Sequence, residues 1–449
     1  MAHLKELTLE NLVATITEST NTITTYLKKN NIQGPSLHED SPVSLPPVPE
    51  VLGARFKLLE AIDAMQNLVS GTAYHNSADL LFRVHDTSIL DVLNQFDFYS
   101  AIPLGGSATV PEIAKKVNLP EKLVRHVLNY AVHMYYFAET APDSGVFVHT
   151  SNSAFFARNP GASDWCTHAI AQTGPFSLHV AESYRKYSAG KEEPSQEVIE
   201  SAASIADLDR TGHPVTFWDY LEHSEEGKPK GYRAALFARA MGFISDALAP
   251  SGNLEVWDDF EWGSLRDGSV IVDVGGSRGH DMLKIAQKFP QHKYIVEDRP
   301  SVEEAFNAAI PAEWRSNISF RAHDFFSPQP VQADLYYLRW ILHDWPDKEA
   351  KQILQNLIPA LKPGALIVIK ERVKTPATDG KGNYVLPRAV RRQIALNDAQ
   401  MHTAFNVFER SVDQWRELVL NADPRFEILS MDGKGAQVNK GIVKIVWRG

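Results

Sequence analysis

The second half of the chain alternates short runs of β-branched residues with helical stretches, and this alternation constrains the fold more than any other feature. The runs begin at Ser269 and read SVIVDV, YIVE, ISFR, DLYYL and ALIVI. Apolar strands that alternate with helices are typical of a parallel sheet covered on both faces. The last two strands, 426–431 and 442–447, are joined by a glycine-rich loop too short for a crossover helix. We therefore predict an α/β fold whose mostly parallel sheet ends in an antiparallel hairpin.

The first of these strands ends in a glycine-rich turn, Asp273-Val-Gly-Gly-Ser-Arg-Gly-His. Glycines at a strand-to-helix turn let a ligand approach the backbone at the carboxyl edge of the sheet. The spacing Gly275-x-Ser277-x-Gly279 matches neither the dinucleotide pattern nor a phosphate loop. Asp298 lies at the tip of the second strand, where a carboxylate can accept hydrogen bonds from both ribose hydroxyls of an adenosine ligand. The alternative for Asp298 is a solvated loop acid.

The start of the chain is predicted to be helical, with a proline-rich interruption. Residues from Leu9 to Leu27 place apolar side chains at helical spacing, which predicts an amphipathic helix. Prolines crowd residues 34–50 and predict an extended linker. Since the helix has no local partner, we favour its docking on a second subunit in a homodimer over packing on its own chain. A further helix is predicted from Val51 to Gly71, where the glycine suits the C′ position.

A winged helix is predicted next. Helices are indicated for residues 89–101, from Thr109 and from Pro120, and two short strands follow at 135–138 and 146–149. Helix, turn, helix and a two-stranded wing form the winged-helix pattern, which suggests DNA binding as one hypothesis.

Charge argues against that hypothesis. The presumed reading helix offers Lys122, Arg125 and His126 without a basic stripe around them, and phosphate contacts supply most of the non-specific affinity for DNA. The whole chain has 45 Lys and Arg against 55 Asp and Glu, a net charge of −10. We therefore expect a structural or dimerising winged helix, with no nucleic-acid partner.

Composition sets further bounds on the class of protein. Cys166 is the single cysteine, so no intrachain disulfide and no cysteine-based zinc cluster can form. No apolar run approaches the ~20 residues that cross a bilayer, and a soluble, cytoplasmic protein without membrane contact is expected. Residues 151–250 are predicted to be helical. Their aromatic and methionine clusters favour core packing over an apolar ligand pocket, and include Phe217, Trp218, Tyr220, Phe237, Met241 and Phe243.

Six segments in sequence resemble the class I S-adenosylmethionine-dependent O-methyltransferases. They are VDVGGSRGH, VEDRP, HDFF, LRWILHDWPDKEA, LKPGALIVIKERV and FERSVDQWREL. More narrowly, the chain is similar to the branch shared by plant caffeate and flavonoid methyltransferases and fungal secondary-metabolite methyltransferases. The resemblance covers the whole chain and implies a Rossmann-like sheet preceded by a helical, winged-helix dimerisation domain. It also implies S-adenosylmethionine as cofactor, a small-molecule substrate, a homodimer and no metal.

This resemblance divides the chain into five expected segments. They are an N-terminal helix at 1–33 that takes part in dimer exchange, a proline-rich linker at 34–50, a winged-helix dimerisation domain at 51–160, a helical connection at 161–262 that contributes to the substrate pocket, and a cofactor-binding catalytic domain at 263–449.

The family pattern assigns cofactor-binding roles by position. Asp298 matches the ribose carboxylate, and Asp324 with Phe325 matches the acid and apolar pair beside the adenine. Arg339 stands where plant members often have lysine. The loop that holds the methionine portion of the cofactor matches Asp273, Gly275, Gly276, Ser277 and Gly279.

The same pattern implies a catalytic base. His343 matches the general base, and Glu371 and Glu409 match the two glutamates that flank it. A phenol with a pKa near ~10 is mostly neutral at pH 7, so its proton must be removed, and a histidine with a pKa near ~6.5 is a suitable acceptor. Glutamates beside the imidazole would fix its tautomer and stabilise the imidazolium. The alternatives are a helix-capping role for His343 and surface positions for both acids.

Three departures from the family pattern stand out. Ser277 replaces a glycine of many plant members, and Phe405 to Glu409 replaces a glycine-containing lead-in. An extra loop from Lys374 to Asn397 could form a lid, recognise an acidic substrate group or be a solvated connection, the option that we favour. It contains Arg388, Arg391 and Arg392.

Two enzymatic functions and one regulatory function remain open from the sequence. The favoured function is O-methylation of a hydroxyl on a small aromatic or polyketide-like secondary metabolite. The alternative is a pericyclase or dehydratase of the same fold that uses bound S-adenosylmethionine as a non-transferring electrostatic cofactor. An intact His343 with two glutamates favours transfer, since a pericyclic reaction needs no base. A transcriptional regulator is disfavoured by acidity and by the complete cofactor pattern.

Overall fold

The chain folds into two compact units. In the computed structural model, residues 7–248, 260–374, 376–381, 384–432 and 441–449 are described. One unit comprises Met1–Gln172 with Pro387–Ala389, and the other comprises Thr173–Leu386 with Val390–Gly449. The five segments expected from the sequence are thus distributed over two compact units, and the boundaries of the individual segments stay predictions.

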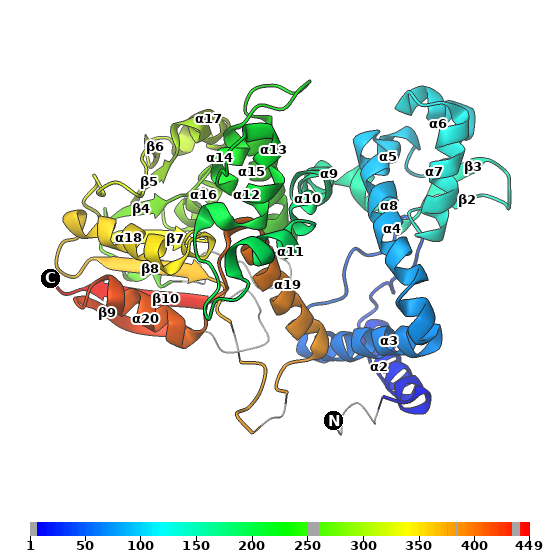
Figure 1. The fold of residues 1–449 in the computed structure, drawn as a ribbon, viewed down its shortest axis with the longest axis horizontal. Coiled ribbons are helices and arrows are strands. Elements are labelled where there is room, and N and C mark those ends of the chain that lie inside the picture. The colour runs from blue at the N-terminus through cyan, green and yellow to red at the C-terminus, as the bar shows by residue number, and fades with distance from the viewer. Residues whose placement is uncertain (1–6, 249–259, 375, 382–383, 433–440) are drawn as a thin grey trace. The chain divides into compact units, whose positions relative to one another are not determined.

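The second unit contains the predicted sheet. Its seven strands follow the order β6-β5-β4-β7-β8-β10-β9 (Figure 1). The first five pair in parallel, whereas β10 runs antiparallel to both β8 and β9, so the prediction of a parallel sheet with a reversed hairpin is confirmed. The loop predicted between the hairpin strands lies outside the described residues. The strands are β4 Val270–Val274, β5 Lys293–Asp298, β6 Ile318–Ala322, β7 Leu335–Arg339, β8 Leu366–Glu371, β9 Phe426–Asp432 and β10 Gly441–Trp447.

Helices cover both faces of this sheet through two apolar clusters. One cluster joins α18 and α20 to the sheet through residues such as Ile353 and Trp415. The other joins α16 and α17 through Met282 and Phe306. Because both faces are covered, the central strands consist almost entirely of apolar residues. The helices around the sheet are α16 His280–Lys288, α17 Glu303–Ala309, α18 Asp347–Leu357, α19 Arg388–Phe405 and α20 Val412–Ala422, with short 3₁₀ turns η6 Trp262–Ser264, η7 Pro300–Val302, η8 Ala312–Trp314, η9 Leu342–Asp344 and η10 Ile358–Ala360.

Short helices precede the sheet in the second unit and enclose an aromatic core. Phe217 and Tyr220 are buried there and pack with Phe176 and Phe405, while Trp218 and Phe237 are partly buried against them. The predicted core packing of these aromatic residues is therefore confirmed. The elements are α10 Gly174–Ser177, α11 Val180–Ser183, η2 Tyr184–Ser188, η3 Val198–Glu200, α12 Ala202–Ala206, α13 Leu208–Thr211, α14 Phe217–Glu222 and α15 Tyr232–Leu248.

The first unit contains the predicted helix, helix and hairpin order. Strands β2 and β3 pair antiparallel, and a further strand, β1, pairs with β3 to give a three-stranded sheet that the sequence did not indicate. Thr109 closes a capping box with Glu112 at the start of α6. The order agrees with the winged-helix prediction. The elements are α4 Ala78–Gln95, α5 Phe98–Ala101, β1 Ala108–Thr109, α6 Val110–Val117, α7 Glu121–His133, β2 Phe137–Glu139, β3 Val146–His149, α8 Ser151–Arg158, α9 Pro160–Thr167 and the π-helix η1 His168–Gln172.

The N-terminal helix α2 (Leu9–Lys29) packs along α3 (Pro49–His75) of the same chain. Ile23 and Leu27 are buried against Val51 and Ala54. This contact corresponds to the alternative that the sequence left open, and exchange of α2 within a dimer stays a prediction. Gly71, where the sequence predicted the helix to end, has φ of 71° and kinks the backbone, and helical structure then continues to His75.

The proline-rich linker is extended, but it lies against the first unit. His38 forms an antiparallel bridge with Thr150, and the Ser151 N–H donates to the Leu37 carbonyl over 3.0 Å. The Gly105 N–H donates to the Glu39 carboxylate over 2.8 Å. These bonds fix where the linker leaves α2 and enters α3.

Candidate functional site

The glycine-rich turn after β4 forms one wall of the candidate site. Gly275 and Gly279 have φ of 73° and 72°, and Ser277 adopts a positive φ of 50°. A Cβ atom on Gly276 would collide with the Asp273 carboxylate, and one on Gly279 would lie 2.9 Å from the ring of Phe306. These positions therefore require glycine, and the serine accepts a backbone conformation that is unusual for a residue with a side chain.

Asp298 at the tip of β5 presents a carboxylate beside this turn. The Ser277 N–H donates to its Oδ2 over 2.8 Å, and the Arg299 N–H donates to its Oδ1 over 2.7 Å. Burial raises the pKa of Asp298, although the two backbone donors lower it. Each oxygen keeps a second lone pair, so the carboxylate can still accept two hydroxyl hydrogen bonds. This donor set fits the ribose of an adenosine cofactor.

Below the turn, a buried ion pair joins β7 to α16. Arg339 Nη1 lies 2.6 Å from Asp281 Oδ1 and 2.5 Å from Oδ2. Asp273 is buried beside them, and burial together with the Asp281 charge raises its pKa well above the usual range. Arg339 therefore holds the first turn of α16, which carries the end of the glycine loop, and its direct contact with a cofactor stays a prediction.

Asp324 and Phe325 lie next to the same turn. The Phe326 N–H donates to Asp324 Oδ1 over 3.0 Å, which fixes the carboxylate. The Phe325 ring packs against Trp345 with centroids 5.9 Å apart. A Cβ atom built on Gly275 would lie 3.8 Å from the Phe325 ring, so the ring reaches the glycine turn. An exposed acid and a flat apolar ring suit an adenine, with its amino group on the acid.

His343 sits in the short turn η9, between β7 and α18, and is buried. Its Nδ1 lies 3.4 Å from Glu409 Oε1 and 3.8 Å from Glu371 Oε2. Its Nε2 lies 3.4 Å from Asp344 Oδ1. The structure therefore brings together the three residues that the sequence pattern placed in the catalytic centre, and it adds Asp344.

These carboxylates set the protonation of the imidazole. Burial alone would lower the pKa of His343, but the negative charges of Glu371, Asp344 and Glu409 raise it to about 9. Burial raises the pKa of Glu371, and it raises that of Asp344 to about 7. Burial acts the same way on Glu409, but the positive charge of His343 and their hydrogen bond outweigh it and lower the pKa. The surrounding carboxylates therefore favour the protonated form of the imidazole in the unliganded protein.

The two glutamates are held differently. Glu371 Oε1 accepts hydrogen bonds from the N–H groups of Ile341 and Leu342 over 2.9 and 2.8 Å, so this carboxylate also fixes the backbone that leads to His343. The Glu409 N–H donates to the Asp398 carboxylate over 2.8 Å. Asn406, in the segment that leads to Glu409, adopts φ of 58°, a conformation that Asn tolerates better than most residues with a side chain.

Arg410 is the most connected residue that the sequence reasoning missed. It is buried, and its guanidinium donates to the carbonyl oxygens of Leu342 and Trp345 over 2.8 and 2.6 Å. It also donates to Asp347 over 2.8 Å. The carbonyl partners flank His343 on both sides, so Arg410 ties the η9 turn to the segment of Glu409. Its position next to Glu409 in the sequence was the only available signal.

Trp340 precedes this turn in a strained conformation, with φ of 54°. Its N–H donates to the Lys370 carbonyl over 3.0 Å. The guanidinium of Arg339 lies 4.5 Å from its ring centroid, and that of Arg372 lies 5.7 Å from it.

The predicted loop from Lys374 to Asn397 is only partly a loop. Helix α19 begins at Arg388, so Arg388, Arg391 and Arg392 belong to its first turns. Arg391 lies 3.6 Å from the ring centroid of Tyr384. Whether this segment acts as a lid, recognises an acidic substrate group or only connects its neighbours stays a prediction.

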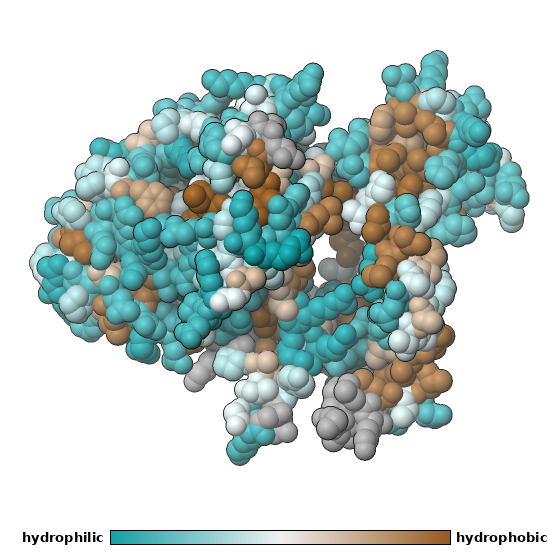
Figure 2. All heavy atoms as spheres, in the orientation of Figure 1, coloured by the Kyte–Doolittle hydropathy of each residue, from teal (hydrophilic) through white to brown (hydrophobic). Residues whose placement is uncertain are grey.

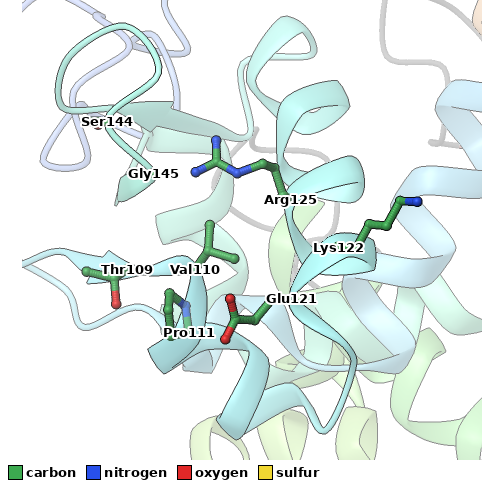
Figure 3. Close-up of a pocket in the computed structure, with 8 residues that line it drawn as sticks. All are labelled: Thr109, Val110, Pro111, Glu121, Lys122, Arg125, Ser144 and Gly145. Carbon is green, nitrogen blue, oxygen red and sulfur yellow. The ribbon is translucent and has the colours of Figure 1, made fainter.

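A separate pocket lies in the first unit, on the predicted winged helix. Figure 3 shows it between the start of α6, helix α7 and the turn before β3. Lys122 and Arg125 share this surface with Glu121, and Arg125 lies 3.9 Å from Glu139. Acidic groups therefore accompany the cations that a DNA reader would need, and the expectation of no nucleic-acid partner stays a prediction.

A parallel sheet with a reversed C-terminal hairpin, a glycine turn after its first strand and an acid at the tip of the second define the fold of S-adenosylmethionine-dependent methyltransferases. Known proteins agree. Residues 241–422 match the O-methyltransferase domain family. The O-methyltransferase lcsG of Purpureocillium lilacinum is 31% identical over 445 residues, which cover 96% of this chain and 92% of that protein.

Solved structures share the fold across nearly the whole chain. The crystal structure of OxaC has a TM-score of 0.75 at 17% identity and covers 97% of this chain and 100% of that one. A structure described as a pericyclic reaction enzyme has a TM-score of 0.69 at 20% identity, over 96% of this chain and 100% of that one. The chain belongs to the O-methyltransferase family. It is an S-adenosylmethionine-dependent enzyme, as the sequence resemblance predicted.

Among the residues that the structure describes, no helix combines the length and the hydropathy that a membrane span needs.

Arg410 offers a first test of the site. Arg410→Ala leaves two buried carbonyl oxygens without their donor, so the η9 turn loosens, and we expect a loss of about 10- to 100-fold in kcat with little change in cofactor affinity. Arg410→Lys keeps the charge but cannot span three acceptors, so it restores only part of the rate. Arg416→Lys, at an exposed position of α20, is the matched control. An unchanged kcat in Arg410→Ala would show that the η9 turn keeps its conformation without Arg410.

The protonation of His343 offers a second test. Because its pKa is raised to about 9, the ring is protonated below that pH and loses its proton as pH rises through 9. Ring signals followed by NMR in the unliganded protein should titrate there, and Glu409→Gln, which removes one negative charge, should lower the midpoint. Glu427→Gln, on the exposed part of β9, is the control. A midpoint near 6.5 in the parent protein would contradict the described charge arrangement.

Proposed function

We propose that this enzyme transfers a methyl group from S-adenosylmethionine to a hydroxyl of a small aromatic or polyketide-like secondary metabolite, with His343 as general base. The observation that carries the proposal is the buried His343, whose Nδ1 faces Glu409 and Glu371 at the carboxyl edge of the sheet. That edge also carries the glycine turn and Asp298, which we propose bind the cofactor.

The proposed role of each residue follows from its contacts. Asp298 accepts the ribose hydroxyls, and Asp324 with Phe325 binds the adenine. The glycine turn, formed by Asp273, Gly275, Gly276, Ser277 and Gly279 with Arg339 beneath it, encloses the methionine portion. When bound, S-adenosylmethionine supplies an electrophilic methyl group on a sulfonium, and this positive charge favours the neutral form of a nearby imidazole.

His343 then removes the proton of the acceptor hydroxyl. Its Nδ1 lies between Glu371 and Glu409, so we propose that the acceptor hydroxyl reaches Nε2, which lies 3.4 Å from Asp344 Oδ1. Glu371 and Glu409 orient the ring and stabilise the imidazolium that forms, as an aspartate does in a hydrolase triad. Holding the oxygen in line with the methyl carbon supplies several kcal/mol of the barrier. With the cofactor bound, the imidazole would take the proton and the oxygen would take the methyl group, while the sulfonium S–C bond breaks and S-adenosylhomocysteine is left.

The similarity to a pericyclic reaction enzyme keeps a second function in view, because that protein has the same fold. A pericyclase on this fold needs the cofactor site and a shaped pocket, but no base. The buried imidazole between two carboxylates is costly to maintain without a proton to transfer, so the site supports methyl transfer better.

We also propose that the enzyme works as a homodimer through its N-terminal helices. Figure 2 shows apolar side chains gathered over α4 and its junction with α3. Val69 is 70% exposed, and Leu81 and Val84 are each 64% exposed. Further exposed apolar residues on these two helices are Leu59, Ile62, Leu68, Leu80 and Phe82. A group of this size rarely faces water in a monomer.

Methyl transfer is tested with cofactor that carries a labelled methyl group. Purified enzyme is incubated with candidate phenols and enols, and the products are analysed by mass spectrometry. We expect label in the product, and near-total loss of label with His343→Ala while cofactor affinity, measured by calorimetry, is retained. A product that is isomerised without label would establish the pericyclase instead, and full methylation by His343→Ala would refute the assigned base.

The dimer is tested by sedimentation. A charge in the middle of the exposed apolar surface cannot be buried unpaired, so Leu81→Asp combined with Val69→Asp should convert the dimer to a monomer. Leu420→Asp, at an exposed position of α20 in the other unit, should leave it a dimer. A monomeric parent protein would overturn this proposal without touching the catalytic one.

A further inference from the structure

Arg372, the first residue after β8, lies beside the proposed catalytic centre. Its Nη1 is 3.6 Å from Glu409 Oε1. This is the same carboxylate oxygen that His343 Nδ1 approaches to 3.4 Å. Arginine and imidazole are therefore neighbours across one oxygen atom. Neither the resemblance nor the sequence pattern assigned a role to Arg372.

The guanidinium of Arg372 has more hydrogen-bonding capacity than its protein contacts use. Its Nε atom is buried and has no hydrogen-bond partner among the described residues. Its contact with Glu409 is long for a charge-assisted hydrogen bond, which is typically 2.7–2.9 Å. A guanidinium has five donors in a planar fork that matches a carboxylate. A largely buried guanidinium whose N–H groups lack acceptors destabilises the protein unless another group accepts their hydrogen bonds.

The side chain remains open to a ligand on one side. It is 19% exposed, whereas His343 is 7% exposed and Glu409 is 3% exposed. The indole of Trp340 lies 5.7 Å away, and its own Nε1 is likewise buried without a partner in the described part of the chain. The exposed part of the Arg372 guanidinium can therefore still donate to a ligand, whereas its Nε and the Trp340 Nε1 are themselves buried.

We propose that Arg372 is a specificity-determining residue that binds an anionic oxygen of the acceptor, a carboxylate or an enolate, next to the hydroxyl that is methylated. This deepens the proposed function and rests on it. The substrate class is then a hydroxy acid or an acidic enol. A guanidinium at this place also opposes the three carboxyl groups around His343, which would otherwise repel such an anion.

The expected effect follows from the strength of such a contact. A hydrogen bond to a charged group corresponds to about 10- to 100-fold in affinity. The enzyme should therefore bind an acceptor acid at least about tenfold more tightly than the neutral amide of the same shape. Arg372→Gln should remove that difference, and Arg372→Lys, which keeps the charge without the fork, should retain part of it.

The test uses 2,4-dihydroxybenzoate and 2,4-dihydroxybenzamide as a matched pair of probes. Binding is measured by calorimetry on the full-length enzyme saturated with S-adenosylhomocysteine, so no turnover interferes. Arg416→Gln, on the exposed face of α20, is the control for loss of a positive charge. We expect the acid-over-amide preference in the parent and in Arg416→Gln, and its loss in Arg372→Gln with amide binding unchanged.

Three results would overturn the proposal. They are an equal affinity for acid and amide in the parent enzyme, an unchanged preference in Arg372→Gln, and no binding of either probe up to about 10 mM. A loss of both affinities in Arg372→Gln would also count against it, since that outcome indicates a structural role.

A parallel assay with labelled cofactor separates this proposal from the function on which it rests. Acid preference without label in any product would refute methyl transfer and leave the anion site standing. Labelled product without acid preference would leave methyl transfer standing and refute the role of Arg372. In the methylation assay, Arg372→Gln should raise KM for the acid and change kcat much less, whereas disordering of Glu409 would lower kcat.

Discussion

The contact between the His343 imidazole and two buried carboxylates is the interaction on which the rest of the site depends. Buried charges are tolerated when they are paired and when their remaining lone pairs are hydrogen-bonded. Glu371 meets the first condition and part of the second, because Oε1 accepts two backbone N–H groups of the adjoining turn, whereas Oε2 faces the imidazole at 3.8 Å without a hydrogen bond to any described residue. This carboxylate therefore contributes both to the charge of the base, together with Asp344 and Glu409, and to the position of its backbone.

The sheet explains how residues far apart in the sequence reach this centre. Strands β4, β5, β7 and β8 run parallel and end at one edge, so the residues that follow them meet there. Asp298, His343 and Glu371 come from three of these strand ends. Glu409 comes from the segment between α19 and α20, and it joins the centre through Arg410 and Asp398.

The sequence predicted those parts of the fold whose causes are local. Continuous β-branched runs predicted the strands, and the glycine turn predicted a site at the edge of β4. Arg410 could not be predicted, because its partners are carbonyl oxygens, which every residue carries. The positions of Asp344 and Arg372 in the site could not be predicted either, because they depend on distances to side chains from other parts of the chain. The sequence left two partners open for α2 for a related reason: an apolar stripe shows that a helix must pack, but not against which surface.

The backbone of Trp340 carries a consequence for how this enzyme could change over time. A bulky residue with φ of 54° is held at a cost of about 1–3 kcal/mol, whereas glycine or asparagine would fit there more easily. Global stability alone would favour such a replacement. The indole at this position lies near two guanidinium groups, so some stability is given up for a large side chain beside the proposed reaction centre. We therefore expect laboratory selection for heat resistance to replace Trp340, and the resulting enzymes to have a higher melting temperature and a lower kcat.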